Sequence, residues 1–324
     1  MMSYSWLQKI LHRFVLSYQF IREVTFDVES SFVSNTKDEG NHVFIAGLAR
    51  SGSTVLLNSI YDSDEFASLS YADMPFVLAP NFWLKMSFKK SHTAPVERAH
   101  GDGIRVSTES PEAFEEVFWM TFEDTKSESY LKFKDYIKLI MSRCNKNRYL
   151  SKNNNNIRRL GIIGAIFPNA TILIPFRNPI QHANSLFLQH KKFIKEGKRD
   201  RFISRYMRWI GHTEFGPSYE PIHCDGIFHT DDLQFNHWLE QWYLTYSECL
   251  QLYSREKHFH FVCYESLCQS DQVWDQVIKL LDIKKTYSAS FQESFKEVFV
   301  DIDPELNLKC DLIYRDLKSI SLKN

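Results

Sequence analysis

Three absences narrow the classes to which this chain of 324 residues can belong. Its six cysteines form no C-x-x-C pair and no dense framework, which favours reduced thiols. No apolar stretch approaches the roughly 20 residues that a membrane-spanning helix needs. The net charge is -1, so the overall charge indicates neither nucleic acid nor an anionic membrane as a partner. Any recognition of a charged ligand must therefore be local.

The first 40 residues predict a helical segment that precedes the main part of the chain. Apolar side chains recur at helical spacing from Trp6 to Tyr18, but charged residues interrupt them and no small-residue cleavage site follows. This pattern is typical of a docking helix, with a membrane-surface helix as the alternative, and not of a signal peptide. We therefore expect a cytoplasmic protein with a helical segment (1–40), a main domain (41–290) and a C-terminal extension that packs on the same domain (291–324).

Apolar runs of strand length alternate with helical patterns along the main domain. Strands are expected at 42–48, at 171–176 and at 258–264, and a further strand ends at about residue 152. Helices are expected at 54–61, 157–167, 179–195, 235–253 and 270–282, and another begins near Pro111 with Ser110 as its cap. Because helices separate the strands, the pattern predicts a three-layer α/β/α fold with a mainly parallel central sheet. Ligands bind beyond the carboxyl ends of strands in such sheets, so residues just after each strand are the first candidates for a site.

The segment VFIAGLARSGST (43–54) carries more functional information than any other stretch. The frame from Gly47 to Thr54 has the G-x-x-x-x-G-x-[ST] spacing of a phosphate-binding P-loop, but Ser53 occupies the position of the lysine in nucleoside triphosphatases. The loop's cation is Arg50 instead. The sequence therefore predicts a P-loop-like turn whose backbone amides and helix N-terminus bind a phosphate ligand other than ATP or GTP.

Two further positions after strands carry suitable cations. Arg177 follows the strand at 171–176 and offers a planar fork of donors for a phosphate, and Ser185 in the next helix can add a hydroxyl. His182, Ser185 and Gln189 share one helix face, which is therefore polar toward the expected site. Lys152 lies between a strand end and a helix, where it can place a point charge beside the same pocket. An ordinary solvent-exposed role is the alternative for each.

Together these segments resemble the sulfotransferases that use 3'-phosphoadenosine 5'-phosphosulfate (PAPS). The resemblance covers roughly residues 42–285 and lies in GLARSGST, YLSKNNNN, ILIPFRNPIQHANSLFLQH and FVCYESL. It implies that the first loop, with Arg50, Ser51, Gly52, Ser53 and Thr54, takes the 5'-phosphosulfate end of PAPS. It further implies that Arg177 and Ser185 take the 3'-phosphate, that Lys152 lies near the transferring sulfuryl group, and that Tyr264 bears on the nucleotide base or the wall beneath it.

The activity implied by the resemblance is transfer of the sulfuryl group to a hydroxyl or amine of a carbohydrate or small-molecule acceptor, with release of 3',5'-ADP. Arg50, Lys152 and the loop amides would stabilise charge on the leaving phosphate. No metal is expected, because the donor presents one bridging phosphate. Neither nucleic acid nor an integral membrane segment is expected as a partner, and the oligomeric state stays open.

A general base would assist an acceptor hydroxyl, and several residues compete for this role. Asp73 ranks first, ahead of His100, because it follows the loop at an interval at which sulfotransferases of the tyrosylprotein type carry a glutamate. His100 offers an imidazole suited to deprotonating a hydroxyl near neutral pH. Glu97, Asp102 and Glu109 are further candidates. The alternative for each carboxylate is an ordinary solvated position in a loop, and for His100 it is an ordinary hydrogen-bonded imidazole.

Two rival functions fit parts of the pattern. A kinase-like phosphotransferase would share the loop architecture, but Ser53 replaces its lysine and Arg177 stands where a carboxylate would end the second strand. A non-catalytic nucleotide-binding protein would keep the loops and lack the base. Two departures from the resemblance also matter: Gln189 stands where some relatives place a basic residue, and Lys309 is a poor match to a C-terminal basic loop.

Overall fold

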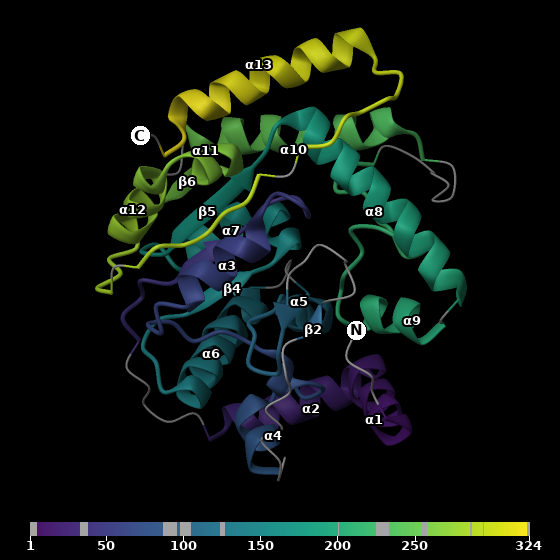
Figure 1. Cartoon of the computed structure of the whole chain (residues 1–324). Coiled ribbons are helices and arrows are strands. Elements are labelled where there is room, and N and C mark those ends of the chain that lie inside the picture. Colours follow the sequence, from purple (N-terminus) through teal and green to yellow (C-terminus); the bar gives the residue numbers. More distant parts are fainter. Residues whose placement is uncertain are drawn as a thin grey trace.

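The computed structural model describes residues 5–32, 38–86, 96–97, 105–123, 127–199, 201–224, 233–254, 258–285, 287–293 and 295–322 (Figure 1). A four-stranded sheet in the order β4-β1-β5-β6 lies at its centre. Its strands are β1 (Val43–Ile45), β4 (Leu150–Lys152), β5 (Thr171–Phe176) and β6 (Phe259–Cys263). Every neighbouring pair in this sheet is parallel, which confirms the predicted α/β architecture.

Alternation along the strands builds two hydrophobic cores, one on each face of the sheet. Phe44 and Ile172 belong to the larger core, whereas Val43, Ile45 and Leu173 belong to the smaller one. Successive side chains of a strand point to opposite faces, so strands that are apolar at every position bury both faces. This pattern is why the strands read as continuous apolar runs.

Helices cover both faces of the sheet. The smaller core contains residues of α3 (Ser53–Tyr61) and α12 (Asp271–Leu280). The larger core contains residues of α2 (Gln19–Ser30), α5 (Glu116–Phe122), α6 (Ser127–Cys144), α7 (Leu160–Ile166), α8 (Pro179–Arg199), α10 (Phe235–Tyr253) and α13 (Pro304–Ile320). The result is the predicted three-layer arrangement.

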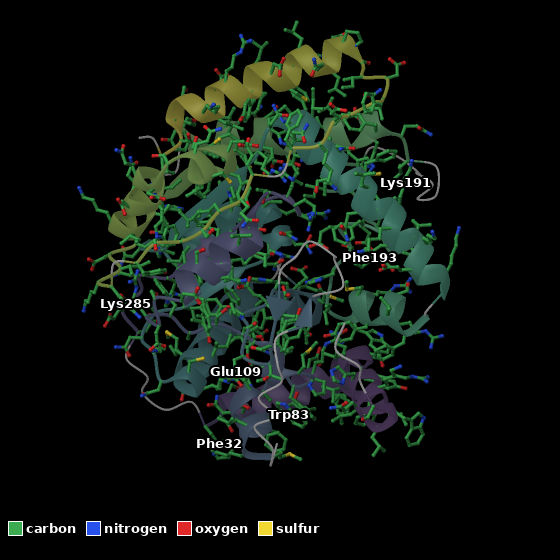
Figure 2. The ribbon with its side chains drawn as sticks, viewed as in Figure 1. Phe32, Trp83, Glu109, Lys191, Phe193 and Lys285 are labelled. Atoms are coloured by element: carbon green, nitrogen blue, oxygen red, sulfur yellow. The ribbon has the colours of Figure 1, made fainter. Side chains whose placement is uncertain are left out.

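Further elements complete the fold. They are α1 (Trp6–Ser17), α4 (Pro80–Met86), α9 (Arg201–Trp209), α11 (Tyr264–Gln269), the short helices η1 (Tyr71–Asp73) and η2 (Asn154–Arg158), and the antiparallel pair β2 (Val96–Glu97) and β3 (Arg105–Val106). Of these, α1, α9 and α11 also add Leu16, Tyr206 and Leu267 to the cores. Helices α2 and α4 lie at one end of the molecule. Figure 2 labels Phe32, just after α2, and Trp83, in α4, at this end. None of the helices among the described residues is both long and apolar enough to cross a membrane.

The structure corrects two predicted element boundaries near the expected site. The helix predicted from Pro111 begins at Glu116, because Pro111 forms a β-bridge with Ser70 and the Ser110 hydroxyl accepts from the amide of Ser107 instead of capping a helix. The strand predicted to reach Tyr264 ends at Cys263, and Tyr264 opens α11. The division of the chain into three parts stays a prediction.

Candidate active site

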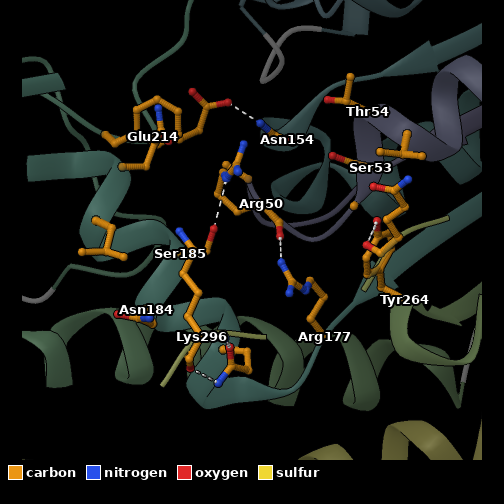
Figure 3. A pocket seen from close by; sticks show the side chains of 18 of the residues that line it. Arg50, Ser53, Thr54, Asn154, Arg177, Asn184, Ser185, Glu214, Tyr264 and Lys296 are labelled. Atoms are coloured by element: carbon orange, nitrogen blue, oxygen red, sulfur yellow. Dashed lines mark hydrogen bonds between the residues drawn. The ribbon is translucent and has the colours of Figure 1, made fainter. Parts of the chain in front are cut away.

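A cavity of about 900 Å³ lies at the carboxyl edge of the sheet. All four parallel strands deliver residues to it: Gly52 in the loop after β1, Lys152 at the end of β4, Arg177 after β5 and Tyr264 after β6. Parallel strands end at the same edge, so four segments that are far apart in sequence meet here (Figure 3). The predicted location of the site agrees with this placement.

The loop after β1 requires glycine at its last position. Gly52 has a φ of 92°, which is left-handed, and it precedes the first turn of α3. A Cβ at this position would lie 2.2 Å from a carbon of the Tyr264 ring, so only glycine lets the ring pack on the loop. The amides in the first turn of a helix have no intrahelical acceptor, and the Ser53 and Thr54 side chains line the cavity beside them. This end of α3 is therefore suited to an anion.

Ser51, which was predicted to bind the donor, supports the turn instead. Its side chain is completely buried and is absent from the cavity lining among the described residues. Its amide donates to the carbonyl of Leu48 at 3.2 Å, so the turn itself uses this donor. The prediction for Ser51 as a ligand is corrected: the serine packs under the loop, close to Gly47.

Arg50, Arg177 and Ser185 come together as the sequence predicted. The Nε of Arg50 donates to Oγ of Ser185 at 3.2 Å, and Nη1 of Arg177 donates to the backbone carbonyl of Arg50 at 3.4 Å (Figure 3). The guanidinium of Arg177 also lies over the Tyr264 ring, 5.3 Å from its centre. We call Arg50, Arg177, Ser185 and the Gly52–Thr54 turn the arginine end of the cavity.

Glu265 and Asn178 fix the direction of Arg177. Glu265 accepts from the amide of Asn178 at 2.9 Å, and its carboxylate lies 3.9 Å from Nε of Arg177. The Asn178 side chain accepts from the amide of Gln181 at 3.1 Å, in the first turn of α8. Both contacts hold the β5–α8 junction, so the arginine leaves the strand in a defined direction.

His182 has a different environment from the one predicted. It is completely buried, and its Nε2 contacts the carbonyl of Ala49 at 2.8 Å. A carbonyl accepts only, so Nε2 carries the proton. Burial lowers the pKa of His182 to about 3, and the imidazole is therefore neutral. His182 thus holds α8 against the loop and is not part of a polar face toward the cavity.

Lys152 lies at the end of β4, opposite Ile45 in the strand register, and lines the cavity. Gln189 lines it as well. Ionisable residues that were not predicted as site residues also line it, namely Glu112, Lys192, His212, Glu214, Glu293 and Lys296. Lys309, considered as a C-terminal cation, lies on α13 and pairs with Glu305 at 2.6 Å.

The structure contradicts Asp73 as the general base. Its side chain is 2% exposed, pairs with Nε of Arg143 at 2.8 Å and accepts from the amide of Ser70 at 2.7 Å. Burial raises the pKa of the carboxyl group, and Asp73 is not among the described residues that line the cavity. The interval along the chain that suggested Asp73 therefore leads to a carboxylate buried against Arg143, which an acceptor does not reach.

The other predicted bases are not placed at the cavity. His100 and Asp102 lie outside the described residues, and so does the side chain of Glu97. Glu109 is exposed and lies toward the end of the molecule that carries Trp83 (Figure 2). Among the described residues, the groups at the cavity that are able to take a proton are therefore ones that the sequence reasoning missed.

Comparison with known proteins identifies the family. A model of the sulfotransferase family matches residues 42–210, more than half of the chain. No curated protein shows significant similarity to the sequence. Solved structures that resemble it include the sulfotransferase STF1 from Mycobacterium tuberculosis H37Rv, with 13% identity over 86% of this chain and 76% of that chain and a TM-score of 0.45.

Two further structures show similar values. The sulfotransferase STF9 from Mycobacterium avium has 12% identity over 98% of this chain and 79% of that chain, with a TM-score of 0.47. A sulfotransferase from Alicyclobacillus acidocaldarius has 13% identity over 88% of this chain and 96% of that chain, with a TM-score of 0.43. The family match itself spans β1 and its loop, β4, β5 and α8, which carry Arg50, Lys152, Arg177 and Ser185. The chain therefore belongs to the sulfotransferase family.

Proposed function

We propose that the protein transfers the sulfuryl group of PAPS to a hydroxyl or amine of a carbohydrate or small-molecule acceptor and releases 3',5'-ADP. The observation that carries this proposal is the arginine end, where two guanidinium groups and a serine hydroxyl meet beside the first turn of α3. A donor with phosphate at both ends of a nucleoside needs two anion sites, and Lys152 adds a third cation to the same cavity.

The residues present fit such a donor. The first turn of α3, with the Ser53 and Thr54 hydroxyls, offers donors for the 5'-phosphosulfate end. Arg177 and Ser185 are the candidates for the 3'-phosphate, because the planar guanidinium suits phosphate oxygens. Tyr264 presents an aromatic wall beside Arg177 for the nucleoside. The donor supplies the activated sulfur, and the protein holds it and offsets its charge.

Lys296 adds a cation that the sequence did not reveal. Its backbone is fixed by two reciprocal hydrogen bonds with the Gln181 side chain, each 2.9 Å long, while its side chain lines the cavity. Figure 3 shows Lys296 on the same side of Arg50 as Arg177. We assign it to the anion site of Arg177, in the role for which Lys309 was a poor match.

Arg50 and Lys152 have a distinct task from these binding residues. As the acceptor attacks sulfur, negative charge grows on the phosphate oxygen that leaves. Cations held in place before the reaction stabilise such charge most effectively, because little reorganisation is needed. Arg50 is tethered to Ser185 and Lys152 to the sheet, so both are held in advance. We assign the acceptor to the side of Arg50 that lies away from Arg177, where Figure 3 shows Glu214.

A kinase-like activity fits this site less well. The side chain at the P-loop lysine position is Ser53, and β5 is followed by Arg177 where a carboxylate would hold Mg²⁺. A non-catalytic nucleotide-binding protein would keep the arginine end and show no turnover. Binding of 3',5'-ADP against Mg-ATP therefore separates the kinase alternative, and sulfuryl transfer from labelled PAPS separates the non-catalytic one.

Calorimetry with Arg177→Ala tests the donor site directly. We expect wild-type protein to bind 3',5'-ADP without metal and the variant to bind it about 100-fold more weakly, because charge-assisted hydrogen bonds to a phosphate are lost. Arg315→Ala, at an exposed position of α13, is the matched control and should bind like wild type. Wild-type affinity in Arg177→Ala would refute the assignment of the 3'-phosphate, and preference for Mg-ATP would refute the proposed function.

A further inference from the structure

The side of the cavity that faces Arg177 across Arg50 is built by three segments: residues 112–116, the run Asn153–Asn156 and residues 211–215. We call these segments the asparagine wall. Figure 3 shows Glu214 and Asn154 on one side of Arg50 and Arg177 on the other. Because donor phosphates are assigned to the arginine end, the acceptor meets the asparagine wall.

The four asparagines connect the three segments. The side-chain amide of Asn153 donates to Oε2 of Glu116 at 2.8 Å, and that of Asn156 donates to Oε1 of Glu115 at 2.8 Å. The amide of Asn154 donates to Glu214, and that of Asn155 donates to the carbonyl of Gly211 at 3.3 Å. Arg159 adds two bonds of 2.8 Å to the Glu116 carboxylate. A buried network of this kind, with charged members, fixes the relative position of the segments it joins.

One member of the wall, His212, is held by its backbone. Helix α9 ends at Trp209, and Gly211 follows with a left-handed φ of 73°. The amide of His212 then donates to the carbonyl of Met207 at 2.9 Å, which closes the helix end. A Cβ at Gly211 would lie 2.3 Å from Cγ of Glu116, so the glycine also lets α9 reach the wall. Both features place the next residue, His212, at the cavity.

The imidazole of His212 is held in one tautomer. Its Nε2 lies 3.1 Å from the carbonyl of Ala113. A carbonyl accepts only, so Nε2 carries the proton and the lone pair of the neutral ring is on Nδ1. The ring is half-buried and lines the cavity. An oriented imidazole whose second nitrogen accepts is the arrangement that proton abstraction requires.

The two carboxylates nearby are less suitable. Oε2 of Glu112 accepts from the Tyr71 hydroxyl at 2.7 Å and Oε1 accepts from the amide of Ala113 at 2.9 Å, so both oxygens already accept a hydrogen bond within the protein. One oxygen of Glu214 accepts from Asn154. Its Oε2 is buried and has no hydrogen-bond partner among the described residues, so an acceptor does not reach it.

We infer that His212 is the catalytic base of the transfer, an inference that rests on the proposed function. Nδ1 takes the proton of the acceptor hydroxyl as its oxygen forms a bond to sulfur. The bond between sulfur and the bridging oxygen of the donor breaks, and its electron pair leaves with 3',5'-ADP. The proton then passes from the imidazolium to solvent. Asn155 is a positioning residue, because its amide holds the carbonyl of Gly211 next to His212.

His212→Gln tests this inference, because the Gln amide keeps a donor for the Ala113 carbonyl and removes the base. Turnover of ³⁵S-labelled PAPS is measured with acceptors from a panel of monosaccharides and phenols. We expect kcat to fall about 100-fold or more, while 3',5'-ADP binds as in wild type. His260→Gln, in β6 and outside the cavity lining, is the control for the same substitution.

Acceptor acidity provides a readout that a structural role would not change. The loss in His212→Gln should be much smaller for 4-nitrophenol, which is already ionised in alkaline buffer, than for a sugar hydroxyl. Equal losses for both acceptors, or a kcat within threefold of wild type, would overturn the inference for His212. His212→Asn provides a second variant, and bound 3',5'-ADP verifies that each variant is folded. Failure of the wild type itself to bind 3',5'-ADP would instead reject the proposed function.

Discussion

The arginine end and the asparagine wall face each other across one cavity, and they are constructed in opposite ways. The arginine end consists of a glycine turn and of side chains in the segments that follow β1 and β5, with one serine from α8. The asparagine wall consists of side-chain amides that reach carboxylates and carbonyls in other segments of the chain. The arginine end therefore forms where the ends of parallel strands meet, whereas the opposite wall depends on side-chain contacts between separate segments.

The two ends also differ in how their charges are balanced. In the wall, the buried Glu116 carboxylate receives both bonds of the Arg159 guanidinium and one from Asn153, so its charge is compensated within the protein. At the arginine end, the Arg177 guanidinium donates to the backbone carbonyl of Arg50 and has the carboxylate of Glu265 nearby, 3.9 Å from Nε. The charge of Glu116 is therefore compensated without a ligand, whereas Arg50 and Arg177 line the cavity, where an anion can reach them.

The comparison predicts that the backbone of the loop matters more than any single side chain at the arginine end. In Gly52→Ala, the new Cβ would overlap the Tyr264 ring, and alanine is strained at a φ of 92°. We expect a loss of about 3 kcal/mol in the free energy of unfolding, and binding of 3',5'-ADP below detection by calorimetry. This is the largest effect that we predict.

Gly161→Ala is the control for this substitution. Gly161 lies in α7, and a Cβ there meets nothing within 4 Å. Alanine should stabilise the helix by about 0.5–1 kcal/mol and leave 3',5'-ADP binding unchanged. Denaturant unfolding and calorimetry on both variants provide the comparison. Normal binding by Gly52→Ala would show that the left-handed turn is not what forms the anion site.

The sequence predicted the arginine end because its signals are local. The bounds of β5 and α10 agree with the predicted ranges, since each is a strongly patterned run. Arg50, Arg177 and Ser185 meet because residues after parallel strands share one edge. The wall could not be predicted in the same way. The Asn154 amide meets Glu214, which is 60 residues away in sequence, and no local pattern encodes such a contact.

His212 also shows how far local sequence patterns can predict the site. The sequence RYMRWIGH contains a signal for the helix end, because glycine after a helical run is typical of its C-terminus. That signal predicts the turn but not the Ala113 carbonyl that orients the imidazole. Asp73 shows the converse error: a family-like interval along the chain leads to a side chain that the fold buries against Arg143.

The buried imidazole behind the arginine end predicts a moderate dependence of stability on pH. His182 stays neutral in the folded protein because burial lowers its pKa to about 3 from 6.5. The unfolded chain takes up this proton as the pH falls below about 6.5, whereas the folded protein does not, so stability is lost between these two values. One such group changes the free energy of unfolding by at most about 1.4 kcal/mol per pH unit.

His182→Gln isolates this contribution, because glutamine does not titrate and its amide can donate to the Ala49 carbonyl. Urea unfolding of wild type and variant at pH 7, 6, 5 and 4 gives the two stability profiles. We expect the difference between them to narrow steadily as the pH falls, since only the wild type loses this term. A constant difference would mean that His182 is not buried as a neutral group.

Asp73→Asn should have the smallest effect on catalysis, although the sequence ranked Asp73 first as the base. The side chain pairs with Arg143 and Ser70 and does not line the cavity among the described residues. Asparagine keeps its shape and one acceptor, so at a temperature where the variant is folded we expect kcat within about twofold of wild type. Because a buried pair is weakened, the melting temperature should fall while the rate does not.

Initial rates of sulfuryl transfer, measured beside His212→Gln at equal concentrations of folded protein, decide between the two residues. A loss of rate in Asp73→Asn as large as that in His212→Gln would assign the base to Asp73 and not to His212. The asparagine wall would then be a scaffold for acceptor binding alone, and the chemical step would depend on a carboxylate that becomes accessible only with both substrates bound.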